Sequence, residues 1–509
     1  MKYHNPIISG FHPDPSVCRV GEDYYLVTST FEYFPGIPIY HSRNLLHWEL
    51  IGHCINRDNM IHLKEGHPNA FGLYAPTIRY HQGVFYVVCT NVAPDEKDHG
   101  NFLVWSRNPR RGWSQPLWLD CPGIDPSLFF DDDGKIYYTG TDSQIYLCEI
   151  DVKTGVRKST CKNIWEGSGG NNPEGPHLYK RHGYYYLLIA EGGTELGHMV
   201  TIARSRNVEG PYESCPRNPI LTNRGTRKSI KAVGHADIFC DHNHHWWATC
   251  LGIRPISYPF RHNLGRETML APMEWDDDGW PVFIDNQLDE IIETDRLPLI
   301  EGETLPTQTE RIHIYDDFKQ MELDRSWNFI YRPLDHLWSI KEEGLWLRGD
   351  ATALSDAKPL AWLGKRQLHH VCKVKTALSF RRESDNEEAG LSIYLNHQHH
   401  YEIVLSRLQG INVLFVRRQI GMLWKIENII PYDRDEAILI LEATRSSYAF
   451  KYIDGQDEKR LGEGETIYLT TEVGGVFTGN YVAIYASGNG RMNTHPTCFH
   501  WFEYDGYHT

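Results

Sequence analysis

The stretch Gly21-Glu22-Asp23-Tyr24-Tyr25-Leu26-Val27 joins a polar turn to a short apolar run that begins with two aromatic residues. The pattern recurs four more times, at residues 82–88 (QGVFYVV), 133–138 (DGKIYY), 182–188 (HGYYYLL) and 243–248 (NHHWWA). Successive copies are separated by about 50 to 60 residues, enough for four short strands. The repeat therefore predicts a five-bladed β-propeller.

The repeat stops near residues 299–308, where Pro298 and Pro306 flank a polar connection. Beyond it the strands lengthen and alternate apolar with polar residues, as at 390–395, 401–405 and 481–485. This alternation is typical of two packed antiparallel sheets. We expect an all-β protein with a propeller over residues 1–305 and a β-sandwich over residues 306–509.

The composition indicates which classes of binding partner the protein has. The formal net charge of −15 leaves no basic surface for nucleic acid. The 15 Trp, 29 Tyr and 19 Phe residues favour a carbohydrate ligand, because sugars pack on flat ring faces, although aromatic residues also fill cores. No run reaches the ~18 apolar residues of a membrane span, and the first residues lack the apolar stretch of a secretory signal. We expect a cytoplasmic protein with no membrane partner, and whether it forms a homo-oligomer stays open.

Three acidic residues precede the aromatic marker by similar intervals. Asp14 lies 11 residues before Tyr25, and Asp125 and Glu174 lie 13 and 12 residues before their own markers. In a propeller, positions of equal phase meet at one end of the central channel. Acids on stiff, proline-flanked backbone are what glycosidic cleavage needs, one to protonate the leaving oxygen and one to activate water. The alternative is that each acid only caps a turn.

Several motifs resemble glycoside hydrolase family 43. They are Asn5-Pro6-Ile7-Ile8, Gly10-Phe11-His12-Pro13-Asp14-Pro15-Ser16, Thr30-Phe31-Glu32-Tyr33-Phe34-Pro35-Gly36, Ile124-Asp125-Pro126-Ser127, Glu174-Gly175-Pro176-His177 and Leu264-Gly265-Arg266-Glu267-Thr268. More narrowly, the chain is similar to the two-domain β-xylosidases and α-L-arabinofuranosidases of that family, whose second domain is a concanavalin-like sandwich.

The resemblance implies an inverting, exo-acting hydrolase that removes terminal pentoses from an oligosaccharide. Asp14 would be the general base, Glu174 the general acid and Asp125 the carboxylate that orients and tunes the acid. The sugar pocket would contain the remaining candidates: Phe31, Tyr74, His235, Arg266 and, from a sandwich loop, Phe477. The alternative for Phe477 is a core position between strands. No cofactor is expected, although some relatives hold an axial ion, so Ca²⁺ near His235 stays open.

Two positions depart from the family pattern. Thr77 stands where many members carry an acid, and Tyr74 stands where xylosidase relatives often carry Trp. The choice between β-D-xylosyl and α-L-arabinofuranosyl substrates therefore stays open. Two other classes remain as alternatives, a non-catalytic carbohydrate-binding protein and a retaining invertase-type glycosidase, although the invertase signatures are absent.

Two other motifs are given structural interpretations. The run Gly167-Ser168-Gly169-Gly170 has no following helix or lysine and is interpreted as a flexible loop, because a phosphate site would need both. His397, His399 and His400 lack Cys or acid partners at metal-ligand spacing and are interpreted as surface strand residues.

Overall fold

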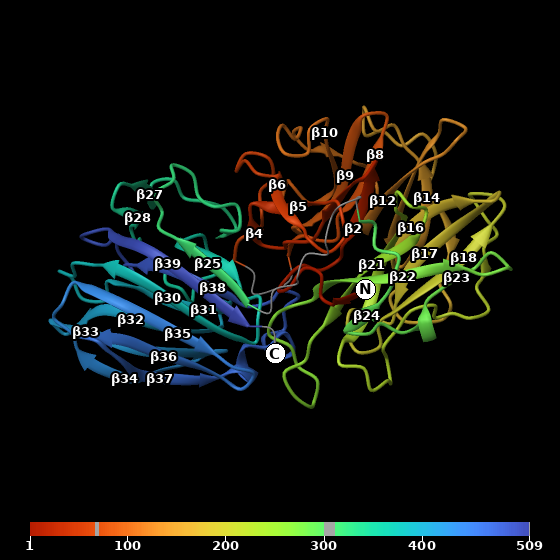
Figure 1. Ribbon diagram of the computed structural model, residues 1–509. Coiled ribbons are helices and arrows are strands. Elements are labelled where there is room, and N and C mark those ends of the chain that lie inside the picture. The colour runs from red at the N-terminus through yellow and green to blue at the C-terminus, as the bar shows by residue number, and fades with distance from the viewer. Residues whose placement is uncertain (67–70, 300–310, 508–509) are drawn as a thin grey trace.

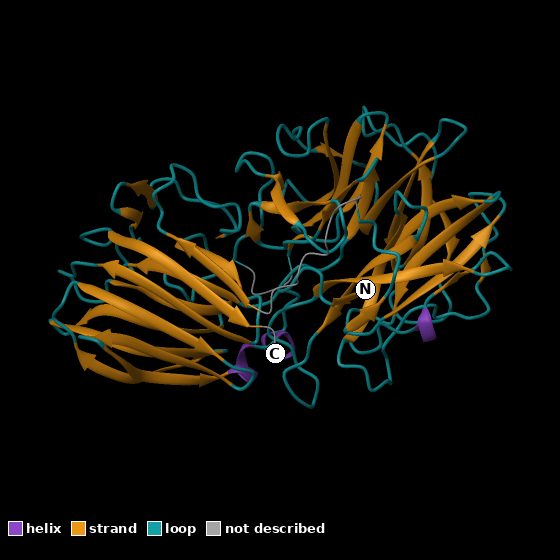
Figure 2. Ribbon diagram, in the orientation of Figure 1, coloured by secondary structure: helices purple, strands orange, loops and turns teal. Residues whose placement is uncertain are grey.

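The computed structural model describes residues 1–66, 71–299 and 311–507 and is built almost wholly from β-strands (Figures 1 and 2). The expected boundary between residues 305 and 306 lies outside the described residues. No helix among the described residues is long and apolar enough to cross a membrane. Each of the eleven cysteines is a free thiol.

The N-terminal part contains five sheets, one for each copy of the aromatic repeat. The first has β2 (Ser16–Val20), β3 (Asp23–Val27), β5 (Gly36–Ser42) and β6 (Glu49–Ile55). The second has β8 (Thr77–His81), β9 (Val84–Val92), β10 (Gly100–Ser106) and β11 (Leu117–Trp118), with β7 (Gly72–Leu73) also on β9. The third has β12 (Ile124–Phe130), β13 (Ile136–Asp142), β14 (Gln144–Glu149) and β15 (Lys162–Trp165).

The fourth sheet has β16 (Glu174–Arg181), β17 (Tyr184–Glu191), β18 (Met199–Ser205) and β19 (Glu213–Ser214). The fifth has β20 (Lys231–Cys240), β21 (Trp246–Ile253), β22 (Glu267–Trp275) and β23 (Pro281–Val282), followed by the short helix η1 (Ile284–Asn286). All five aromatic pairs lie in the second strand of their sheet.

The first strands of the five sheets close a ring. β2 contacts β8, and contacts continue through β12, β16 and β20 back to β2. The ends of this part are tied by pairing of β1 (Lys2–His4) with β24 (Ile291–Glu293). The Asn5 side chain reinforces that closure, because its Nδ2 donates to the Leu270 carbonyl oxygen at 3.0 Å. The predicted five-bladed propeller is confirmed.

The C-terminal part is a sandwich of two antiparallel sheets. One contains β25 (Arg311–Asp316), β27 (Trp338–Lys341), β28 (Gly344–Leu347), β30 (Val371–Ser379), β35 (Glu436–Ala443), β36 (Ser447–Asp454), β37 (Asp457–Glu465) and β39 (Thr497–Tyr507). The other contains β29 (Ala361–Arg366), β31 (Glu388–Asn396), β32 (His399–Leu408), β33 (Ile411–Ile420), β34 (Leu423–Pro431) and β38 (Tyr481–Ser487). The short helices η2 (Thr466–Leu469) and α1 (Thr471–Gly474) precede β38.

The two parts pack against each other. β4 (Tyr33–Phe34), which belongs to the propeller sequence, pairs with β26 (Phe329–Ile330) of the C-terminal part. The Tyr33 ring stacks on Tyr481 with a centroid distance of 4.1 Å.

In the second sheet of the sandwich, His399 and His400 are buried, so their interpretation as surface residues is wrong. The inner strands β31 and β32 are buried on both faces along most of their length, which strand alternation alone does not reveal.

Candidate active site

The candidate acids lie at one end of the innermost propeller strands. Asp14 comes two residues before β2, Asp125 is the second residue of β12, and Glu174 is the first residue of β16. Thr77 begins β8, and His235 lies within β20. Four of the five positions of equal phase thus lie at or just before the start of their strands, and His235 lies in the middle of β20.

Backbone irregularities aim these side chains. The register of β12 shifts between Ile124 and Ser127, and that of β16 shifts after Glu174, as at β-bulges. Asp14 and Asp125 adopt φ values of 55° and 56°, a region that non-glycine residues seldom occupy. Local propensity opposes such conformations, so packing of the ring must hold them, as is common at functional sites.

Asp14 is a buried carboxylate with strong polar partners. Arg266 Nη1 donates to its Oδ1 at 2.8 Å, and the Ser29 hydroxyl donates to its Oδ2. Burial raises the pKa of Asp14, but Arg266, His235 and Ser29 outweigh burial and leave the pKa below its ordinary value. Asp14 is therefore ionised near neutral pH. A carboxylate has about four acceptor positions, so it can still accept a proton from water.

Asp125 and Glu174 have the opposite electrostatics. Burial raises the pKa of Asp125 to about 7, helped by the neighbouring charges of Glu174 and Asp14. Burial and the Asp14 charge raise the pKa of Glu174 to about 7. The two carboxyls titrate as a coupled pair. Asp125 Oδ2 accepts the backbone N–H of Gly175 at 3.0 Å, so it holds the chain directly after Glu174.

His235 lies beside Asp14 and Gly175. Its Nδ1 lies 3.9 Å from Asp14 Oδ1. Its ring covers Gly175, where an added Cβ would lie 3.0 Å from His235 Cε1. Gly175 also has a φ of 59°, a backbone conformation that favours glycine. This conformation and the nearby histidine ring together explain why glycine follows Glu174.

Aromatic rings line the approach to the acids. Phe31 lies 5.0 Å from Tyr74 and 5.8 Å from Phe477 between ring centroids. The Arg266 guanidinium lies 5.7 Å from the centroids of both phenylalanine rings. Phe477 is 36% exposed and therefore does not occupy the core position that was its alternative. The structure brings all eight candidate residues into one region.

The Phe477 loop is anchored on the propeller. His262 Nδ1 lies 2.7 Å from Glu472 Oε1, which joins α1 to the segment before Arg266. An added Cβ at Gly479 would lie 2.3 Å from the Leu264 carbonyl oxygen, so the backbones approach as closely as glycine permits. These contacts fix where Phe477 can reach.

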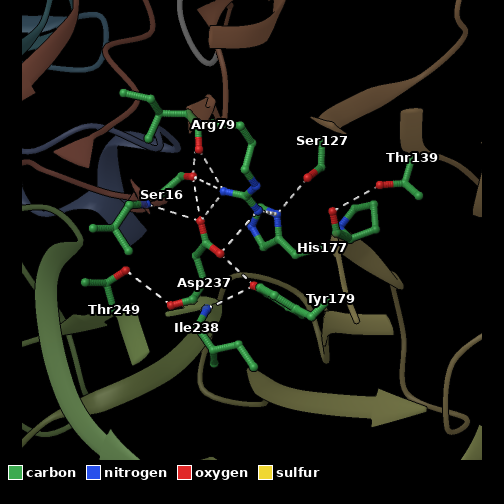
Figure 3. A network of polar contacts seen from close by, with 12 residues as sticks. Ser16, Arg79, Ser127, Thr139, His177, Tyr179, Asp237, Ile238 and Thr249 are labelled. Atoms are coloured by element: carbon green, nitrogen blue, oxygen red, sulfur yellow. Dashed lines mark hydrogen bonds and ion pairs between the residues drawn. The ribbon is translucent and has the colours of Figure 1, made fainter. Parts of the chain in front are cut away.

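One layer deeper, the propeller axis is filled by polar side chains (Figure 3). Each innermost strand contributes one of Ser16, Arg79, Ser127, His177 and Asp237. Arg79 Nη1 lies 2.7 Å from Asp237 Oδ2, and Arg79 Nη2 lies 3.0 Å from His177 Nδ1. The acids therefore lie above a layer of hydrogen-bonded polar side chains that occupies the propeller axis.

Three polar contributors were missed from the sequence. Ser29 binds Asp14, and Thr194 Oγ1 accepts from Arg266 Nη1 at 3.0 Å. Glu191, fully buried at the end of β17, accepts the backbone N–H groups of Ser168 and Gly170 at 3.0 and 2.7 Å. Residues 167–170, which were interpreted from the sequence as a flexible loop, are thus held by the Glu191 carboxylate. This run lies just before Glu174 in the chain. The sequence signal for Glu191 was an acidic residue at the end of an apolar strand.

Glycoside hydrolases use one ionised acid and one acid that carries a proton, and this propeller places such a set at one end of its innermost strands. Residues 3–281 match the model of glycosyl hydrolases family 43, and residues 315–505 match that of the beta xylosidase C-terminal concanavalin A-like domain. The chain belongs to glycosyl hydrolases family 43. The resemblance stated from the motifs is confirmed.

Similar proteins extend over the whole chain. The non-reducing end alpha-L-arabinofuranosidase BoGH43B of Bacteroides ovatus is 39% identical, over 99% of this chain and 94% of its own. A beta-xylosidase of Bacillus subtilis is 32% identical over 99% of both chains. The solved structure of the family 43 protein BlXynB of Bacillus licheniformis has a TM-score of 0.91 at 32% identity and covers both chains fully.

Replacing Phe477 by alanine is expected to raise KM and lower kcat/KM roughly 10-fold or more with little change in Tm. The ring contacts Phe31 and Arg266 at the pocket but is partly exposed, so its loss removes a pocket wall and little core. Steady-state kinetics and thermal unfolding measure the two effects. Trp424→Ala, which removes a 64% exposed ring in β34, is the matched control and should change neither quantity. Unchanged kinetics with a large fall in Tm would assign Phe477 to the core.

Proposed function

We propose that the enzyme removes terminal α-L-arabinofuranosyl and β-D-xylosyl residues from hemicellulose oligosaccharides, with inversion of configuration. The observation that carries the proposal is the placement of Asp14 and Glu174 at the starts of β2 and β16, which are not neighbours in the ring. The names of the similar arabinofuranosidase and beta-xylosidase support the two sugars.

The proposed reaction is a single displacement. Asp14 removes a proton from water as the water oxygen attacks the anomeric carbon. Glu174 gives its proton to the glycosidic oxygen as the bond to the anomeric carbon breaks. This displacement requires carboxyls about 6.5 to 9.5 Å apart with a water between them, whereas a covalent intermediate requires carboxyls about 5 to 5.5 Å apart.

Asp125, Arg266 and the aromatic rings assist in this proposal. Asp125 holds the Gly175 backbone and so orients the neighbouring Glu174. Arg266 keeps Asp14 ionised and positions it through their hydrogen bond. Phe31, Tyr74 and Phe477 supply the walls of the sugar pocket, and His235 lies beside Asp14.

The proposed reaction uses no cofactor. Calcium prefers six to eight oxygen ligands. Among residues 1–66, 71–299 and 311–507, no three His, Cys, Asp or Glu side chains form a group able to bind one metal ion. On the axis, Asp237 is already paired with the Arg79 guanidinium. These side chains do not fit a carboxylate-bound calcium ion.

Proton NMR of the first product tests the proposal. A β-xyloside should release α-xylose before mutarotation mixes the anomers, and an α-L-arabinofuranoside should release the β-anomer. Both nitrophenyl glycosides should be hydrolysed, and xylo-oligosaccharides should lose single sugars from the non-reducing end. Retention of configuration would favour the invertase-type alternative. The absence of turnover on either glycoside would favour the carbohydrate-binding alternative.

A further inference from the structure

Arg366 is a buried cation between the propeller and the sandwich. It ends β29, is 6% exposed, and lies 5.8 Å from the ring centroid of Phe11 and 5.7 Å from that of Tyr481. Its Nη1 donates to Asn328 Oδ1 at 3.0 Å. Within the part of the chain that the structure describes, Nε and Nη2 have no hydrogen-bond partner and no carboxylate forms an ion pair with the guanidinium. A buried, unpaired charge is costly, so this arrangement needs an explanation.

The neighbouring polar atoms without partners are also donors. Asn328 Nδ2, the Tyr481 hydroxyl and Trp362 Nε1 are buried and lack a partner among the described residues. Arg366 is paired with Tyr481 across β29 and β38, so their side chains share one face of the sheet. Trp362 lies on the same face, with its ring over Gly364, the residue whose backbone pairs with Asn328.

The other titratable groups near Arg366 leave its charge uncompensated. Burial, followed by the Arg366 charge, lowers the pKa of His12 and lowers that of His53 to about 3. Both histidines are therefore neutral. Lys365 is paired with Asp324 at 2.9 Å, so that carboxylate is already matched by a cation. One positive charge remains.

Water and an anion differ in how well they satisfy this group. A water molecule would accept from these donors and donate to the Tyr481 hydroxyl oxygen, but it would leave the charge of the guanidinium unneutralised. A small anion accepts from every donor and compensates the guanidinium, and hydrogen bonds between charged partners are the stronger ones. The chemistry therefore favours an inorganic anion.

We propose that a chloride ion binds in the sandwich where it meets the propeller, held by Arg366 Nε and Nη2 with Asn328 and Tyr481. The ion lies on the sandwich side of the interface, where the propeller residue Phe11 packs on the Arg366 guanidinium. Phe11, which lies under the guanidinium, is 6.0 Å from Phe31 of the pocket wall. Chloride binding thus stabilises the face of the sandwich on which the propeller packs.

Crystals of the full chain soaked in sodium bromide test the site directly. An anomalous bromide peak within hydrogen-bond distance of Arg366 Nε and Nη2 is expected. A water molecule there, or no density, would overturn the proposal. This measurement uses the unaltered protein and so does not depend on whether a variant folds.

Thermal unfolding tests the consequence. Tm should be higher by about 3 °C or more in sodium chloride than in sodium isethionate of equal ionic strength, because isethionate is a much larger anion than chloride. Arg366→Met should abolish that difference, whereas Arg43→Met, at an exposed arginine paired with Glu22, should retain it. Equal Tm values of the unaltered protein in the two salts would overturn the proposal even if bromide binds in the crystal.

Discussion

Replacing Asp14 by asparagine is expected to lower kcat roughly 10³- to 10⁴-fold while the fold is retained. Asparagine keeps the size of the side chain but cannot accept a proton from water. Ser29 and Arg266 hold the native carboxylate in its ionised form, so the substitution removes a negative charge that the unaltered enzyme carries at neutral pH. Kinetics on both nitrophenyl glycosides, with thermal unfolding, measure the change.

The control is a buried aspartate outside the pocket. Asp131 is bound by Lys180 and Tyr185 at the outer end of β12. Asp131→Asn should lower Tm and leave kcat within a few-fold of the unaltered enzyme. Sodium azide, which needs no base to attack, should restore turnover of Asp14→Asn and give a glycosyl azide of inverted configuration. A variant that keeps a tenth of the original rate would contradict the assignment of Asp14 as base.

Replacing Glu174 by glutamine is expected to reduce hydrolysis of disaccharides roughly 10³-fold or more, and that of dinitrophenyl glycosides less than about 10-fold. A sugar hydroxyl leaves poorly unless it is protonated, whereas dinitrophenolate leaves without a proton. Comparing kcat for the two substrates gives the result. An equal loss on both would show that Glu174 has another role.

The same variant should change the pH profile. Burial and the Asp14 charge raise the pKa of Glu174 to about 7, so this carboxyl keeps its proton below that pH and loses it above. Disaccharide hydrolysis by the unaltered enzyme should therefore fall as pH rises through about 7. It should also fall in acid, where Asp14 takes up a proton. When the activated dinitrophenyl glycoside is the substrate, Glu174→Gln should show no decline of kcat at high pH.

Much of the fold could be predicted because each blade repeats a local pattern. A turn and two aromatic residues identify the second strand, and counting back from it reaches the first. The acids could be found in the same way, since residues of equal phase converge wherever identical units surround an axis. Tyr74 and Arg266 came instead from a resemblance in short motifs.

The sequence by itself determined the order of strands, the two-part organisation and the three acids, because these depend on local periodicity and on repetition. Only the tertiary structure decided which distant groups meet. The contacts of Asp14 with Arg266, of Phe477 with Phe31 and of Glu191 with the glycine loop depend on ring closure and domain docking. The pKa values of Asp125 and Glu174 depend on the same packing, since burial and neighbouring charge are properties of the folded chain.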